Sequence, residues 1–188
     1  MSDETPLVGE YAIDGSVNTG PNALILQKKQ AIASGTATHF RFYITEGIYA
    51  KVCVYSDVSG SPALLLANSS KVLLIAGWNN IPLGGGCDIV SGAEYWLGFI
   101  QGTLKPCGRT TSSGVQYKYK SHPIDNDLPS PLTGLSNFTG PRYSLSLWQI
   151  VSGGAGRLIG SGDPSMIHVG HPKMIHVANP SLIRARGG

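Results

Sequence analysis

The sequence predicts an all-β fold, an antiparallel two-sheet β-sandwich of jelly-roll-like form that carries an extended C-terminal arm. Three observations lead to this prediction. Long stretches are rich in Val, Ile, Tyr and Thr with turn residues between them, which is typical of strands. Gly (25 residues) and Pro (12 residues) are too numerous for a mainly helical chain, and only 13% of the residues are charged. The third observation is an eight-residue repeat over residues 157–188.

The length of 188 residues fits one domain with an appendage. Residues 1–150 are predicted to form the sandwich, because a body of this size buries about two thirds of its unfolded surface in a single core. Residues 151–156 (VSGGAG) are interpreted as a Gly-rich linker. Residues 157–188 are the predicted arm.

Charge and targeting patterns exclude several classes of protein. The formal net charge of +3 is small and most Lys and Arg residues are scattered, so nucleic-acid binding is not expected. The amino end opens with acidic residues and has no basic segment before an apolar run, so we expect synthesis in the cytosol without a signal peptide. No segment reaches the roughly 18 apolar residues that a membrane span requires, so no membrane partner is expected.

The first half of the body is predicted to consist of strands. Residues 23–44 are interpreted as two strands joined by a polar turn at Lys28 and Lys29, although residues 23–33 also have the composition of a short helix. In residues 48–55 (IYAKVCVY), every second residue is Ile, Ala or Val. This alternation indicates a strand with one buried face.

The rest of the body is divided by turn-forming segments into eight to ten strands in all, with turns about every ten residues. Turns or breaks are expected at residues 56–62, 68–70, 77, 84–86 and 91–92, a loop at 101–114, and strands at 95–100, 115–120 and 142–150. Residues 121–141 are crowded with Pro, Ser, Asn and Gly. A loop of this length in a compact domain is usually functional or an ordered excursion over the surface.

Residues 50–99 also contain recognisable elements. They are Val54-Tyr55-Ser56-Asp57, Gly60-Ser61-Pro62, Gly77-Trp78-Asn79 before Pro82-Leu83, and Gly92 followed by Tyr95-Trp96-Leu97-Gly98-Phe99. Through these elements the stretch resembles a β-sandwich module found in secreted carbohydrate-active enzymes, surface proteins and phage structural proteins. The resemblance covers about a quarter of the chain. It implies a fold and carries no catalytic signature, and it keeps carbohydrate binding as a hypothesis.

Aromatic residues are the candidates for ligand contact. Trp96 lies in an apolar strand and Trp78 lies at a turn that the resemblance makes structural, so both are expected in the core. Trp148 is left open between core and surface. Tyr117 and Tyr119 alternate with lysines, so we expect both to be exposed and predict that they form a ligand-binding face, with a glycan as the candidate ligand.

No metal, cofactor or active site is predicted. His168, His171 and His176 lack a Cys or carboxylate at ligand spacing, so they would bind metal only if several chains brought them together. Residues 125–127 (Asp-Asn-Asp) are interpreted as a turn rather than a calcium loop. The cysteines, which are Cys53, Cys87 and Cys107, are expected to be buried thiols. Neither a nucleophile elbow nor a phosphate-binding loop is present, so an enzyme is not expected.

The C-terminal arm is predicted to be an assembly element. Each octad contains two adjacent apolar residues, and the first three octads end in Pro; the apolar residues are Leu158, Ile159, Met166, Ile167, Met174, Ile175, Leu182 and Ile183. In an extended chain adjacent residues point to opposite faces, so each unit resembles a short strand that is buried on both sides. Proline then limits each strand to about five or six residues. Such a unit needs partners.

Two functions are compatible with this organisation. The first is a non-enzymatic structural protein of a virion or other supramolecular particle, such as a phage capsid-decorating, tail or fibre component, whose subunits associate with one another and with other virion proteins through the arm. The second is a lectin-like carbohydrate-binding module that the tail oligomerises for avidity. The repetitive arm favours the first. An arm that packs on its own body is the remaining alternative.

Overall fold

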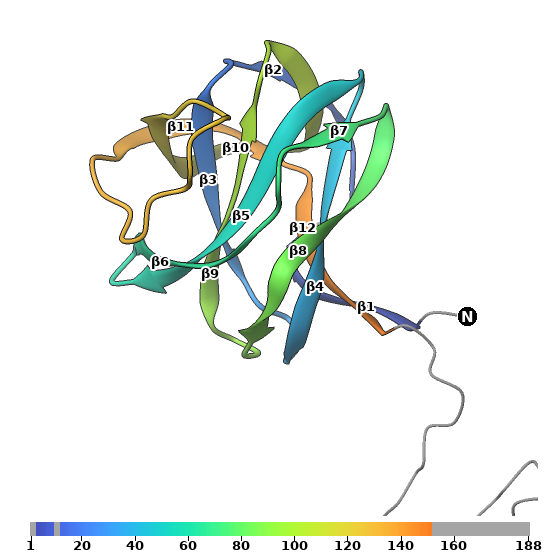
Figure 1. Cartoon of the computed structure of the whole chain (residues 1–188), viewed down its shortest axis with the longest axis vertical. Helices are drawn as coiled ribbons and strands as arrows, with labels where there is room; N and C mark the ends of the chain where they lie inside the picture. Colours follow the sequence, from blue (N-terminus) through green and yellow to red (C-terminus); the bar gives the residue numbers. More distant parts are fainter. Residues whose placement is uncertain (1–2, 10–11, 152–188) are drawn as a thin grey trace, which may run out of the picture. The chain divides into compact units, whose positions relative to one another are not determined.

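The computed structural model describes residues 3–9 and 12–151, which form an all-β, antiparallel fold (Figure 1). The strands in this part of the chain are β1 (Asp3–Gly9), β2 (Gly15–Thr19), β3 (Ala23–Gln30), β4 (Gly35–Ile44), β5 (Ile48–Val58), β6 (Ser61–Asn68), β7 (Val72–Leu74), β8 (Gly77–Ile89), β9 (Glu94–Gln101), β10 (Lys105–Ser121), β11 (Ser136–Tyr143) and β12 (Leu145–Val151). The described residues contain no helix and therefore none that could cross a membrane. The chain divides into two units, Met1–Gly153 and Gly154–Gly188, and the predicted arm lies outside the described residues.

The strands form one hydrogen-bonded network. Its order is β1-β12-β4-β10-β3-β9-β5-β6, with β2 and β11 paired to β10, β7 to β5 and β8 to β4. The long strand β10 joins the two halves of this network. Its first part pairs with β2 and meets β4 where Cys107 lies opposite Ile44, and its second part lies between β3 and β11.

The two halves pack face to face around a main core. Phe42 of β4 and Phe99 of β9 are not on neighbouring strands, yet their ring centroids are 4.7 Å apart. Both side chains are fully buried, together with Phe40, Val52 and Leu97. Burial of each large apolar side chain of this kind stabilises the fold by about 1.5–3 kcal/mol.

A second hydrophobic core lies on the outer face of β3, β9 and β5. Residues 122–135 cross this face, and Ile124 and Leu132 pack on it. The strand residues beneath them are Leu24, Leu26, Cys53, Tyr55, Trp96 and Ile100. The Tyr55 hydroxyl donates a hydrogen bond to the carbonyl oxygen of Pro129 at 2.9 Å. The ordered excursion expected for the long loop is therefore confirmed, and the excursion itself is shorter than predicted.

The second core explains why β5 is buried on both faces along much of its length. The predicted alternation places Ile48, Ala50, Val52 and Val54 in the main core, as expected. The alternation predicted only one buried face, but Tyr55 on the opposite face is also buried beneath the loop, beside Cys53, which was expected to be buried as a thiol. Space on this face is tight at Gly98, where an added Cβ would lie 2.8 Å from the Cys53 sulfur.

Several predicted turns are wrong because they lie inside strands. Lys28 and Lys29 belong to β3, where Lys28 forms a cross-strand ion pair with Glu94 at 2.7 Å. The glycines 84–86 lie within β8, and Gly85 and Gly86 have positive φ angles near a register shift against β4. Most of the loop expected at 101–114 belongs to β10.

The remaining differences concern three strands that were not predicted and the first residue of the linker. β1, β2 and β11 were not predicted, because their sequences combine acids, Gly, Pro and Asn without a run of alternating apolar residues. They are held instead by pairing with other strands, β1 with β12 and both β2 and β11 with β10. The predicted linker begins one residue too early, since Val151 is the last residue of β12.

Candidate functional site

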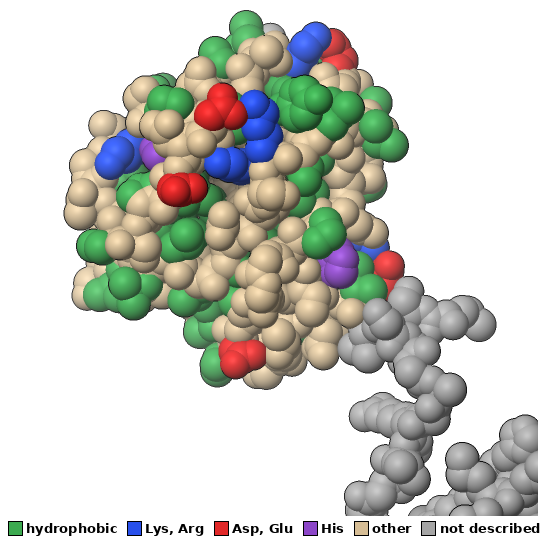
Figure 2. All heavy atoms as spheres, in the orientation of Figure 1, with side chains coloured by type: hydrophobic (Ala, Val, Ile, Leu, Met, Phe, Trp, Pro, Cys, Tyr) green, Lys and Arg blue, Asp and Glu red, His purple; other side chains and the backbone are tan. Residues whose placement is uncertain are grey.

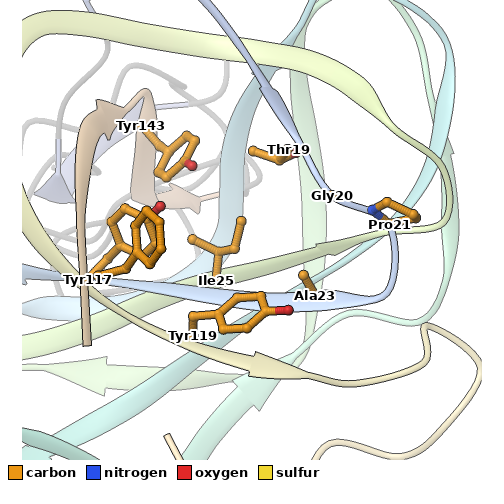
Figure 3. A pocket seen from close by; sticks show the side chains of 9 residues that line it. Thr19, Gly20, Pro21, Ala23, Ile25, Tyr117, Tyr119 and Tyr143 are labelled. Atoms are coloured by element: carbon orange, nitrogen blue, oxygen red, sulfur yellow. The ribbon is translucent and has the colours of Figure 1, made fainter. Parts of the chain in front are cut away.

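Tyr117 and Tyr119 line a pocket of about 200 Å³ on the surface of the body (Figure 3). Both come from the second part of β10, which pairs with β3 and β11. The other lining residues come from the β2–β3 connection, from β3 and from β11: Thr19, Gly20, Pro21, Ala23, Ile25, Phe138 and Tyr143. The pocket therefore lies where residues 19–25 meet the consecutive strands β10 and β11, which are distant from them in the sequence.

An aromatic cluster forms one wall of this pocket. The Tyr117 ring centroid lies 5.3 Å from that of Phe138 and 5.9 Å from that of Tyr143. Tyr143 in turn contacts Phe99 of the main core edge to face, with centroids 5.1 Å apart. Edge-to-face and tilted contacts at such distances are favourable for aromatic rings. The wall is thus continuous with the main core and is held rigidly.

Buried polar contacts fix the position of Tyr143. The Gln27 side chain accepts a hydrogen bond from the Tyr143 backbone N–H at 3.0 Å and donates one to the Pro141 carbonyl oxygen at 3.2 Å. Gln27 is fully buried on β3, so it ties β3 to the end of β11. A Cβ on Gly140 would lie 2.6 Å from the Tyr117 ring, so glycine is needed there for the ring to occupy its place.

A polar group lies beside the pocket. The Thr19 hydroxyl donates a hydrogen bond to the Oε1 atom of Gln101, whose side chain is buried. The Nε2 atom of Gln101 is also buried and has no hydrogen-bond partner among the described residues. Gln101 itself does not line the pocket, so the polar group that the pocket presents here is the Thr19 hydroxyl.

The hydroxyl groups of Tyr117 and Tyr143 are neutral at ordinary pH. Burial raises the pKa of Tyr117, partly offset by a hydrogen bond with Tyr143. Burial also raises the pKa of Tyr143, far above its usual range. The pocket therefore offers aromatic surface and uncharged hydroxyl groups, which suit a small neutral ligand.

The structure places both predicted ligand residues at the pocket, but the exposed fractions of their side chains differ. Tyr119 is 38% exposed, as expected, whereas Tyr117 is only 8% exposed, so the exposure predicted for Tyr117 is wrong. Its face of β10 is turned toward the main core and is covered by Phe138 and Tyr143. Thr19, Phe138 and Tyr143 were missed, because only the pairing of β2 and β11 with β10 places them here.

The three tryptophans differ from one another. Trp96 is 3% exposed, so its predicted core position is confirmed. Trp78 was also expected in the core, but it is 37% exposed, because its side chain lies on the outer face of β8. Trp148, which the sequence left open, is half-buried on β12.

The turn interpretation of residues 125–127 agrees with the contacts. The Asp125 carboxylate forms an ion pair with Lys71 at 2.7 Å, which lowers the pKa of Asp125. The Asn126 backbone N–H donates a hydrogen bond to the Pro123 carbonyl oxygen at 3.1 Å. Among the described residues, no group of His, Cys, Asp or Glu side chains could hold a metal ion. His168, His171 and His176 lie outside this part of the chain.

The cysteines are buried free thiols, which confirms their predicted state. Burial is the main reason that the pKa of the thiol rises to about 11 in Cys87 and to about 12 in Cys107, and it raises the pKa of Cys53 still further. Thiolate is the nucleophilic form, so these thiols are unreactive at neutral pH.

An exposed apolar patch lies where β5 pairs with β7. It consists of Tyr49, Leu73 and Ile75, which are 52%, 61% and 70% exposed. Tyr49 lies directly opposite Leu73 in the register. The ammonium group of Lys71 lies 5.4 Å from the centroid of the Tyr49 ring at the border of the patch. Figure 2 shows hydrophobic side chains gathered in this region over β7.

The predicted assembly residues in the arm, from Leu158 to Ile183, lie outside the described residues. Among the described residues, the exposed apolar patch is the surface that is relevant to association. We refer to Tyr49, Leu73 and Ile75 as the β5–β7 patch.

Comparisons with protein-family models, with curated proteins and with solved structures give no match.

Proposed function

We propose that the protein is a non-enzymatic structural component of a virion or other supramolecular particle. Its body is a jelly-roll-like antiparallel β-sandwich, and its C-terminal arm joins it to further copies of the same chain. A capsid-decorating, tail or fibre component has this organisation. Other proteins of the particle are additional partners.

The β5–β7 patch carries this proposal. Three large apolar side chains with more than half of their surface exposed lie together on one part of the body. Contiguous exposed apolar surface on a soluble protein usually marks a site of protein association. None of the three residues of the patch lines the tyrosine pocket.

The arm provides the second element of the proposal. Its octads place two apolar residues in each short unit, and an isolated unit of this length is not stable in water. At about 3.3 Å per residue, residues 157–188 reach roughly 100 Å when extended, enough to cross a neighbouring subunit. The arm therefore has both the length and the apolar surface to bind another copy.

Size exclusion with light scattering tests the proposal on three chains: the full chain, a chain that stops at Gly156, and the full chain with Leu73→Asp and Ile75→Asp. We expect the full chain to form a defined oligomer or filament, the truncated chain to be a folded monomer, and the double variant to have a lower mass than the full chain. Val90→Asp with Leu104→Asp is the matched control, since both residues are exposed apolar residues elsewhere. A full chain that is a monomer of 19.8 kDa contradicts the proposal.

A second candidate is carbohydrate binding, favoured by the aromatic wall and hydroxyl groups of the tyrosine pocket. Under this proposal the arm serves to increase avidity. Saturable glycan binding that is lost in Tyr119→Ala supports it. Tyr119 is the better choice for this test, because Tyr117 packs against Phe138 and Tyr143 and its removal would disturb the fold.

A further inference from the structure

A groove of about 330 Å³ lies on the outer face of β8, β4 and β12, and it is lined by Arg41, Trp78, Asn80 and Trp148. The register places these residues on one face, since Asn80 lies opposite Arg41 and Trp148 lies opposite His39. Residues of β4 on the other face belong to the main core. Figure 1 shows the three strands side by side with β1 at their edge. The groove is separate from the tyrosine pocket.

Arg41 is held in one orientation in this groove. Its Nε atom donates a hydrogen bond to the Asn80 Oδ1 atom at 2.6 Å, and its Nη2 atom forms an ion pair with Glu4 of β1. The guanidinium carbon lies 3.9 Å from the centroid of the Trp148 ring, a stacked cation–π arrangement. Contacts on three sides fix the guanidinium before any ligand binds, which reduces the entropy lost on binding.

The two indole rings present different surfaces. The Trp78 ring meets Tyr43 edge to face, with centroids 5.5 Å apart, and more than a third of the Trp78 surface remains exposed. One face of Trp148 is covered by Arg41, and its indole N–H donates a hydrogen bond to the Ser146 hydroxyl at 2.9 Å. Trp78 is thus the ring available for stacking, and Trp148 holds Arg41 in place.

The charge in the groove is balanced. Glu4 neutralises Arg41, so the groove has no excess positive charge to attract a phosphate or carboxylate ligand. His39 adds none at neutral pH, because burial lowers its pKa and the opposing effect of Glu4 is smaller. Two hydrogen-bonding groups remain in the groove. They are the uncharged amide of Asn80 and the guanidinium of Arg41, whose charge Glu4 compensates. A wholly apolar ligand would remove these groups from water without replacing their hydrogen bonds.

We propose that this groove binds a neutral saccharide, with the apolar face of a sugar ring on Trp78 and its hydroxyl groups on Asn80 and Arg41. A sugar ring combines an apolar C–H face with hydroxyl groups that both donate and accept hydrogen bonds. This combination matches an exposed indole beside a fixed guanidinium and an amide. The groove shares no residue with the β5–β7 patch, and it gives the carbohydrate-binding candidate a second, larger site.

A proline-rich peptide is the main competing ligand for an aromatic groove. Such peptides pack prolines on aromatic rings and also need hydrogen-bond donors for their carbonyl groups. In this groove the indole N–H of Trp148 is already bonded to Ser146, and Arg41 is bonded to Glu4 and Asn80, so few donors remain for carbonyl groups that can only accept hydrogen bonds. A sugar hydroxyl can also donate to the acceptor oxygens of these groups. The saccharide is therefore the ligand that the contacts favour, and a proline-rich peptide is an outcome to be tested.

Calorimetric titration of the full chain tests the proposal. The probes are neutral tetrasaccharides of glucose in α- and β-linkage, mannose, xylose, galactose and N-acetylglucosamine, together with tetragalacturonate as an acidic probe and a deca-proline peptide. We expect saturable binding of at least one neutral tetrasaccharide. We expect Trp78→Ala to weaken this binding by about tenfold or more, because it removes the stacking ring.

Four further variants test whether the groove itself holds the saccharide. Arg41→Lys keeps the charge but loses the planar fork, so we expect it to weaken binding. Val90→Ala and Leu104→Ala, at exposed apolar residues that line neither the groove nor the tyrosine pocket, are matched controls that we expect to leave the affinity unchanged, and Tyr119→Ala tests the tyrosine pocket as the alternative site. Circular dichroism and the thermal midpoint of each variant report whether it folds.

Four results would overturn the proposal. They are no binding of any neutral probe at concentrations up to about 10 mM, neutral saccharide binding that a folded Trp78→Ala chain retains, preference for the acidic probe, and preference for the peptide. Loss of binding in Tyr119→Ala with retention in Trp78→Ala assigns the saccharide to the tyrosine pocket instead. Oligomer mass is measured on the same samples, so a failure of the assembly proposal is recorded separately.

Discussion

The two outer faces of the strand network differ in whether the chain covers them. The face over β3, β9 and β5 is covered by residues 122–135, and Trp96 on this face is 3% exposed. The face over β8, β4 and β12 has no such cover among the described residues, and Trp78 on this face is 37% exposed. Both tryptophans point outward from their strands, away from the main core.

This difference shows that an outward-facing tryptophan has two possible roles. Under a covering loop it forms part of a second core, where the Trp96 indole N–H is satisfied by the Asp57 carboxylate at 2.6 Å. On a bare face, the same residue type leaves ring surface available for a ligand. A segment that is distant in the sequence decides between these roles.

Alanine at the two tryptophans tests this comparison most strongly. We expect Trp96→Ala to lower the free energy of unfolding by about 3–5 kcal/mol, because it leaves a cavity beneath the loop. For Trp78→Ala we expect about 1 kcal/mol or less, since much of the ring is already in water. Urea denaturation measures both. Trp96→Phe keeps most of the volume and serves if Trp96→Ala does not fold; equal losses for the two alanine variants would contradict the comparison.

The next test weakens the packing of residues 122–135 on the strands beneath them. Leu132→Ala removes an anchor of residues 122–135 and is expected to cost about 2–3 kcal/mol. Cys53 lies beneath this loop, whereas Cys87 lies in the main core. Because burial raises the pKa of both thiols, iodoacetamide at pH 8 should react slowly with each of them in the native protein.

In Leu132→Ala we expect faster alkylation of Cys53 and no change at Cys87, which mass spectrometry of the labelled peptides resolves. Leu104→Ala is the control, because Leu104 is exposed and far from the loop in the sequence. Equal acceleration at both cysteines would mean that the body opens as a whole and that the cover is not an independent unit.

The smallest expected effect concerns His39 on the bare face. Burial lowers its pKa from the ordinary value of 6.5, so the folded state binds a proton less readily than the unfolded state. The free energy of unfolding should therefore be highest above about pH 6.5 and decrease slightly as the pH falls through this value. Urea midpoints at pH 7.5 and 5.5 measure the decrease. His39→Gln should reduce it, and an unchanged decrease in that variant would assign it to other groups.

Local pattern predicted a large part of the fold. Alternation in residues 48–55 identified β5 and the face that it turns to the main core, and the strands expected at 95–100 and 142–150 correspond to most of β9 and of β12. β1, β2 and β11 could not be found this way, because pairing rather than apolar alternation defines them: β1 and β2 pair with strands far away in the sequence, and β11 pairs with β10 across the long loop. A strand that depends on such pairing needs no apolar alternation of its own.

The candidate sites likewise combine features that the local sequence pattern predicts with features that only strand pairing creates. Tyr117 and Tyr119 could be placed on one face of a strand from their spacing, but the covering of Tyr117 depends on Phe138, in a segment whose composition predicts a loop. The groove was missed because the sequence around Trp78 predicts a structural turn. Its partners Arg41 and Trp148 lie on β4 and β12, and only the register of the network brings the three together.

The pairing of β1 with β12 also has a mechanical consequence. Asp3 lies opposite Val151, so the two strand ends where the chain enters and leaves the body are neighbours at the same end of one antiparallel ladder. A pulling force between these ends opens the ladder hydrogen bonds one after another, as in unzipping, instead of loading them all at once. β1 would therefore peel away at low tension before the remaining strands are strained. In a particle that pulls on its subunits through the arm while residue 3 is held, this strand would act as the extensible part of the body.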